Sequence, residues 1–134
     1  MSNIIEWSDD YSVGVDLIDS QHKHFIGILN ELYECLETSN TQKLPSILKE
    51  LATYADVHFD TEEKYFDEFH YEGSKEHKAV HDDLKLKVLE FLRKKGDPIA
   101  IGYELLDFLE DWLINHLDLM DKKYTKCFNQ HGLK

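Results

Sequence analysis

Histidine and acidic residues recur at helical spacing within segments whose apolar residues also follow a helical period. His58 and Glu62 lie four residues apart, and His77 and His81 repeat this spacing. Four residues of α-helix advance about 6 Å and return to nearly the same side, so each pair projects from one helix face, while Glu63 is rotated away. This spacing is typical of metal ligands. It predicts helices that meet around one metal centre.

Four segments carry apolar residues at steps of three and four, the pattern of helices that face other helices. We expect an all-α, up-down-up-down four-helix bundle that forms one domain over residues 1–134. The expected elements are an N-terminal arm over 1–18, bundle helices over 19–38, 41–69, 74–95 and 97–117, and a C-terminal helical segment over 118–131. The inward-facing seams are His22, Phe25, Leu29, Leu32 and Leu36; Leu44, Leu48, Leu51, Ala55, His58, Glu62 and Tyr65; His77, His81, Leu84, Val88 and Phe91; and Ile101, Leu105, Phe108, Trp112 and His116.

Local signals predict where these helices begin and end. Asp19 or Ser20 is the expected N-cap of the first helix, and Ser74 that of the third. Gly96 follows two lysines and is in position to end the third helix. Pro98 is suited to the first position of the fourth.

The direction of each helix gives an independent check on the metal site. In this topology the starts of the first and third helices lie beside the ends of the second and fourth. The starts carry His22, His77 and His81, and the ends carry His58, Glu62 and His116. Each histidine alone would more often be structural or exposed, but their common layer favours a shared metal.

The remaining histidines and the cysteines fall outside this pattern. We expect His24, His70 and His131 on the surface or in loops. Cys35 and Cys127 are far apart in sequence, which favours two reduced thiols over a disulfide.

Composition excludes several classes of partner. A formal net charge of −12 repels nucleic acid phosphates and anionic lipid headgroups. No stretch approaches the roughly 20 apolar residues of a membrane-spanning helix, and the N-terminus lacks the features of a signal peptide. We therefore expect a cytoplasmic protein with no nucleic acid partner and no membrane insertion. The pattern shows no exposed apolar patch, so a monomer is expected.

Several motifs follow one another along nearly the entire chain. They are Trp7, Tyr11 and Val13-Gly14-Val15 in the arm, then Asp19-Ser20-Gln21-His22, His58-Phe59-x-x-Glu62, His77-x-x-x-His81 and His116-x-x-x-x-Asp121. Together they resemble the hemerythrin family, specifically its single-domain bacterial members. The resemblance implies two iron ions per chain, in the Fe2+ and Fe3+ states, with an oxo or hydroxo bridge. It also implies that His77, His81 and His116 hold one iron, that His22 and His58 hold the other, and that Glu62 and Asp121 bridge them.

This ligand set implies reversible binding of dioxygen. One coordination position stays open, on the iron with two histidines, and an open position distinguishes a reactive metal site from a structural one. Bundle di-iron enzymes typically use carboxylate-rich ligands, whereas five imidazoles predominate here, so we expect a non-enzyme without catalytic residues. Phe59, Trp112 and Leu113 are candidates to line an apolar oxygen pocket. From the sequence, they are equally well explained as ordinary residues of the hydrophobic core.

Other functions remain compatible with the same ligands. A di-iron oxidase or peroxidase would turn over with a reductant and peroxide. A module that binds iron itself or nitric oxide would act as a store or sensor. If dioxygen is bound, it serves storage, transport or delivery, and an oxygen-consuming enzyme is a candidate partner.

Asp121 does not follow from regular helix geometry. It lies five residues after His116, about 140° around the helix, whereas Met120 holds the favourable position. A local widening or break of the helix is required before Asp121 can join the site. Asp118 competes for the role but is rotated about 200° from His116.

Overall fold

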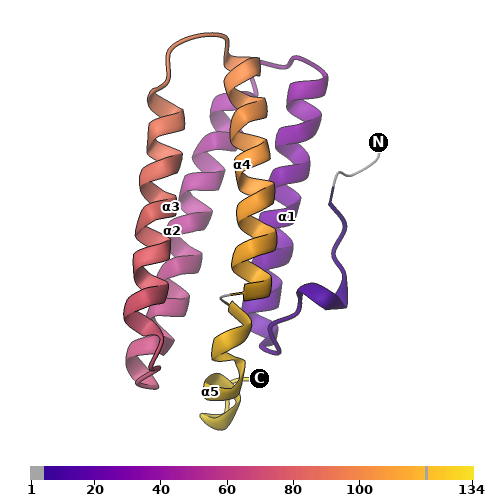
Figure 1. The fold of residues 1–134 in the computed structure, drawn as a ribbon. Helices are drawn as coiled ribbons and strands as arrows, with labels where there is room; N and C mark the ends of the chain where they lie inside the picture. Colours follow the sequence, from indigo (N-terminus) through magenta and orange to yellow (C-terminus); the bar gives the residue numbers. More distant parts are fainter. Residues whose placement is uncertain (1–4, 120) are drawn as a thin grey trace.

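Four long helices run antiparallel to one another in the computed structural model of this protein (Figure 1). They are α1 (Asp16–Glu37), α2 (Leu44–Glu68), α3 (Ser74–Arg93) and α4 (Pro98–Leu119). A 3-10 turn, η1 (Asp9–Tyr11), precedes them, and η2 (Asp121–Tyr124) and α5 (Thr125–Gln130) follow. The structure describes residues 5–119 and 121–134, except for the side chains of 114, 115, 117–119 and 121. These residues include no strand, so the expected all-α four-helix bundle is confirmed.

Two of the expected helix caps are wrong. α1 begins at Asp16 with Val15 at the N-cap, so Asp19 lies within the helix. The Asp19 carboxylate instead accepts hydrogen bonds from the Val13 N–H at 2.9 Å and from the Ser12 hydroxyl. Ser74 is the first residue of α3 rather than its cap. An acid or serine near a helix start can bond several neighbouring groups, and the sequence alone does not select among them.

The junction of α3 and α4 follows its local signals more closely. α3 ends at Arg93, with Lys94 at the C-cap, and Gly96 lies in the loop with a φ of +140°. Pro98 occupies the first position of α4, as predicted. The Asp97 carboxylate accepts a hydrogen bond from the Ile99 N–H at 3.2 Å, which satisfies one of the free donors at the helix start.

The seams predicted from periodicity face the inside of the bundle. Every seam residue is buried or half-buried in the structure. Close packing of α1 on α4 depends on Gly102, because a Cβ added there would clash with the Leu36 side chain. The apolar seam residues belong to one core cluster between the helices.

The N-terminal arm and α5 are tied to each other at the histidine-bearing end of the bundle. The Asn129 amide donates to the Gly14 carbonyl at 3.1 Å, and the Thr125 hydroxyl donates to the Val13 carbonyl. Gly14 has a φ of +73°, and a Cβ there would meet Thr125 at 2.8 Å, so both conformation and space favour glycine. Figure 1 shows α5 at the lower end of the bundle and the arm beside α1.

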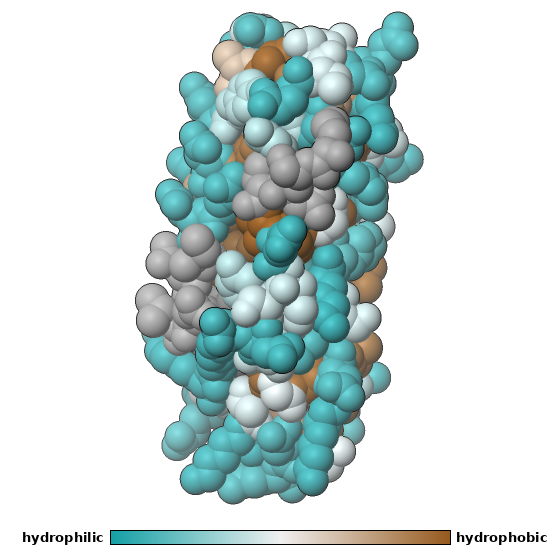
Figure 2. Space-filling model, turned by 90° about the vertical axis from the view of Figure 1, so that its right-hand side faces the viewer, coloured by the Kyte–Doolittle hydropathy of each residue, from teal (hydrophilic) through white to brown (hydrophobic). Residues whose placement is uncertain are grey.

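The surface carries scattered rather than continuous apolar area on the face seen in Figure 2, which is mostly hydrophilic with small hydrophobic strips. No helix among the described residues is long and apolar enough to cross a membrane. Cys35 and Cys127 are both free thiols, as expected, and burial raises the pKa of each. His24, His70 and His131 are exposed, as expected.

Candidate metal centre

Six side chains of metal-binding type meet inside one end of the bundle. α1 contributes His22, α2 contributes His58 and Glu62, α3 contributes His77 and His81, and α4 contributes His116. Each is at most 2% exposed to solvent. The starts of α1 and α3 and the ends of α2 and α4 share the lower end of the molecule in Figure 1. The single layer predicted from helix direction is therefore present.

The Glu62 carboxylate lies at the centre of this cluster. Its Oε1 is 3.1 Å from Nε2 of His58, 3.1 Å from Nε2 of His81 and 3.9 Å from Nε2 of His77. The imidazoles also approach one another in pairs across the bundle: His22 and His58 through Nε2 atoms 3.2 Å apart, and His77 and His116 through Nε2 atoms 3.1 Å apart. The inward nitrogen is thus Nε2 in every ring with a contact of this kind.

These side chains form two groups that share one member. Glu62, His77, His81 and His116 make one group, and His22, His58 and Glu62 make the other, with the donor atoms of each within 4.8 Å of one another. Burying a carboxylate is costly unless a positive charge or hydrogen bonds compensate. Imidazole nitrogens that converge on a buried carboxylate suit a transition-metal cation, including iron. The donor set therefore fits the iron site that the resemblance implies.

Asp121 is the one expected ligand that the described residues do not test. Its side chain lies outside them, as does that of the competing Asp118. α4 ends at Leu119 and η2 begins at Asp121. The described backbone is thus α-helical from His116 to Leu119 and a 3-10 helix from Asp121 to Tyr124.

The outward nitrogens of two imidazoles have partners that the sequence did not identify. Nδ1 of His58 is 2.6 Å from Oε1 of Gln21, and Nδ1 of His81 is 3.0 Å from Oε2 of Glu63. Glu63 belongs to neither metal-binding group, as its rotation predicted, but it reaches the outer side of the next helix's histidine. The one sequence signal that could have identified these partners is their position next to predicted ligands, because Gln21 precedes His22 and Glu63 follows Glu62.

Aromatic rings hold two of the histidines in place. The Phe59 ring stacks on His81 with centroids 3.9 Å apart and planes 10° apart. Trp112 stacks on His116 with centroids 4.2 Å apart and planes 13° apart. Packing of this kind restricts ring rotation, so the donor atoms stay oriented toward the cluster.

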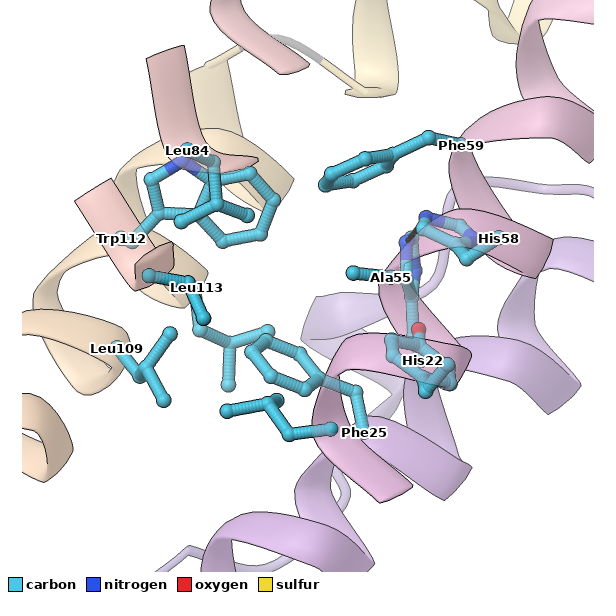
Figure 3. Close-up of a pocket in the computed structure, with 12 residues that line it drawn as sticks. His22, Phe25, Ala55, His58, Phe59, Leu84, Leu109, Trp112 and Leu113 are labelled. Atoms are coloured by element: carbon cyan, nitrogen blue, oxygen red, sulfur yellow. Dashed lines mark hydrogen bonds between the residues drawn. The ribbon is translucent and has the colours of Figure 1, made fainter. Parts of the chain in front are cut away.

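A small cavity of about 20 Å³ adjoins the His22–His58 side of the cluster. The pocket candidates Phe59, Trp112 and Leu113 all line it, and Figure 3 shows these side chains around the same space as His22 and His58. The sequence missed the other lining residues, which are Phe25, Leu51, Tyr54, Ala55, Leu84, Val88 and Leu109. Most are seam residues one or two turns from the histidines. A space of this size holds one molecule as small as water or dioxygen.

Comparisons with known proteins agree with this site. Residues 13–127 match the family model of the hemerythrin HHE cation binding domain. A bacteriohemerythrin of Clostridium acetobutylicum is 34% identical, over 88% of this chain and 96% of that protein. A bacteriohemerythrin of Methylococcus capsulatus is 30% identical, over 90% of this chain and 92% of that protein.

The fold comparison gives the same result. The crystal structure of a wild-type hemerythrin superimposes with a TM-score of 0.83 at 28% identity and covers 92% of this chain and 97% of its own. The family model, the bacterial relatives and the shared fold all lead to the same conclusion. This chain belongs to the hemerythrin family.

Proposed function

We propose that this protein binds dioxygen reversibly at a centre of two iron ions. The observation that carries the proposal is the position of the small cavity. It lies beside His22 and His58, the group with fewer ligands, and its lining does not include His77, His81 or His116. An incoming diatomic molecule would thus meet the side of the centre with room for another ligand.

The proposed ligand assignment follows the two observed groups. His77, His81 and His116 would hold one iron, His22 and His58 the other, and Glu62 would bridge the two because it belongs to both groups. Asp121 is proposed as the second bridge, on the family resemblance. When bound, the iron pair would supply an oxo or hydroxo bridge, the electrons for binding dioxygen and one open coordination position.

The protein around this position would favour binding over catalysis. Phe59, Trp112 and Leu113 line the cavity with hydrocarbon and indole. An apolar lining of this kind would disfavour water there, because it offers few hydrogen-bond partners. Five imidazoles and two carboxylates give a less anionic set than that of bundle di-iron enzymes. The proposed activity is therefore storage, transport or delivery of dioxygen, without a catalytic residue and with an oxygen-consuming enzyme as candidate recipient.

The test is the iron content of the protein and its visible absorption as oxygen is added and removed. We expect two irons per chain and a charge-transfer band that appears when oxygen is added to the reduced protein and disappears on degassing. An irreversible change, with turnover of peroxide and a reductant, would replace the proposal with an oxidase or peroxidase. Iron that is readily released and never gives the band would point to iron handling.

A pair of variants separates the ligand assignment from general effects. His77→Ala should lower the iron content or abolish the oxygen-dependent band. His24→Ala is the matched control, because His24 lies on the bundle surface with its side chain 57% exposed. Retention of two irons and normal oxygen binding in His77→Ala would remove His77 from the centre.

A further inference from the structure

The outer nitrogens of His58 and His81 face acceptors of different charge. His58 contacts the neutral amide of Gln21, whereas His81 contacts the carboxylate of Glu63. A carboxylate can accept a hydrogen bond through either oxygen, so a flip of the group does not change what His81 meets. An amide offers an oxygen on one side and an NH2 on the other, so the orientation of Gln21 decides what His58 meets.

Thr61 fixes that orientation. The Thr61 hydroxyl has one hydrogen, and it donates this hydrogen to the Val57 carbonyl at 2.8 Å, one turn earlier in α2. Its oxygen can then only accept from Gln21, whose Nε2 lies 3.2 Å away. The NH2 of Gln21 is thereby turned toward Thr61, and the amide oxygen is turned toward His58.

The proton on His58 follows from this arrangement. The Gln21 oxygen only accepts, so Nδ1 of His58 must carry the proton and donate it across the 2.6 Å contact. Neutral imidazole carries one proton, which leaves the lone pair on Nε2. That nitrogen faces Glu62 and His22, and a metal binds only a nitrogen with a free lone pair. A reversed amide would favour the opposite tautomer, with Nε2 blocked.

We propose that Gln21, oriented by Thr61, is a positioning residue that holds His58 in the tautomer competent to bind metal. The hydrogen-bond chain joins α1 to α2, because Gln21 lies in α1 and Thr61, Val57 and His58 lie in α2. It acts on the group of fewer ligands, where loss of one donor has the larger effect. The inference deepens the proposed function, since it concerns the ligand beside the oxygen cavity.

The test measures Co2+ binding to the full chain by visible absorption, with the metal alone as probe. Gln21→Met keeps the side-chain length but removes the acceptor, and the affinity of the weaker site should fall about 10- to 100-fold. Gln21→Glu restores an acceptor and should bind within about threefold of the parent or more tightly. A packing role predicts the reverse order, because methionine is the better filler and glutamate adds a charge.

Thr61 supplies a second variant, because it hydrogen-bonds Gln21 and Val57 and its replacement leaves both Gln21 and His58 in place. Thr61→Val has nearly the same shape and frees the amide to turn, so a loss of severalfold in Co2+ affinity is expected, smaller than for Gln21→Met. Thr53→Val is the matched control, an exposed threonine of the same helix. In the zinc-loaded chain, proton NMR should show a slowly exchanging imidazole N–H of His58 that Gln21→Met loses and Gln21→Glu keeps.

Two results would overturn the inference. One is parental Co2+ affinity in Thr61→Val and Gln21→Met. The other is a Gln21→Glu variant as weak as Gln21→Met. Co2+ binding does not depend on oxygen, so these results leave the proposed function to its own test with iron and oxygen. Equally, an iron-loaded protein that fails to bind oxygen would not affect the order of the Co2+ affinities.

Discussion

The Glu62 carboxylate lies 3.1 Å from Nε2 of His81, and neither side chain is exposed to solvent. The two residues come from different helices, α2 and α3, so the contact joins the bundle across its core. Glu62 is also the only residue that the two described metal-binding groups share. Both groups therefore depend on the carboxylate of this one side chain.

Replacement of Glu62 by glutamine should weaken metal binding in both groups. The amide has the same size but no charge, and it cannot attract two cations in a site that excludes water. We expect fewer than two irons per chain and at least a tenfold loss of Co2+ affinity, measured by metal analysis and titration. Glu68→Gln, an exposed site in the same helix, should leave both quantities unchanged. Full iron content in Glu62→Gln would argue against a bridging role.

Removal of metal should destabilise the bundle. A ligand that binds only the folded state adds about 2.7 kcal/mol when its free concentration is 100 times Kd. For a chain of this length that corresponds to a change in Tm of roughly 10 °C. Thermal unfolding with a chelator, and again after metal is restored, measures the difference. An identical Tm in both states would mean that the buried cluster holds no metal under those conditions.

Leu113→Asn should speed oxidation of the iron-loaded protein by oxygen. Leu113 is 1% exposed and lines the cavity, so an amide there would admit water beside the open coordination position. Folding stability should also fall, by about 3 kcal/mol, because a polar group is buried and the leucine packing is lost. Leu106→Asn is the control, since Leu106 is also buried in α4 but is not among the residues that line the cavity. Equal autoxidation rates in the two variants would remove Leu113 from the pocket.

Titration of tyrosine should reveal a cluster at the opposite end of the bundle. A hydrogen bond to Glu37 raises the pKa of Tyr103 to about 12, and a hydrogen bond to the same carboxylate raises the pKa of Tyr33. Hydrogen bonds from Tyr103 and Tyr33 lower the pKa of Glu37. These contacts link the end of α1 to the start of α4.

The signs of these shifts fix the pH dependence. A tyrosine with a raised pKa contributes stability that is complete below pH 10.0 and is lost as the pH rises toward about 12. A glutamate with a lowered pKa contributes stability that is complete above pH 4.5 and is lost as the pH falls through its folded value. In Glu37→Gln, ultraviolet titration should show both tyrosines ionising at lower pH than in the parent. Glu34→Gln, an exposed neighbour, should leave their titration unchanged.

Residue spacing and helix order are enough to predict the bundle and the residues that meet in it. Helical spacing set His58 beside Glu62 and His77 beside His81, because residues four apart share a helix face whatever surrounds them. Helix direction then brought His22 and His116 to the same end. Residue spacing and helix order can be read directly from the sequence, and the structure has the same four residues and the two further histidines at one end of the bundle.

The surroundings of those residues depend on contacts between helices, which residue spacing does not predict. Gln21 and Glu63 face the outer nitrogens of histidines on neighbouring helices, and no spacing within one helix encodes a contact between two. The cavity beside His22 and His58 likewise depends on how side chains of different helices fill the space between them. The start of α1 at Asp16 was also missed, because Asp19 bonds the arm that packs before it rather than its own helix end. Periodicity predicts which face is inward, whereas packing between elements decides which atoms touch.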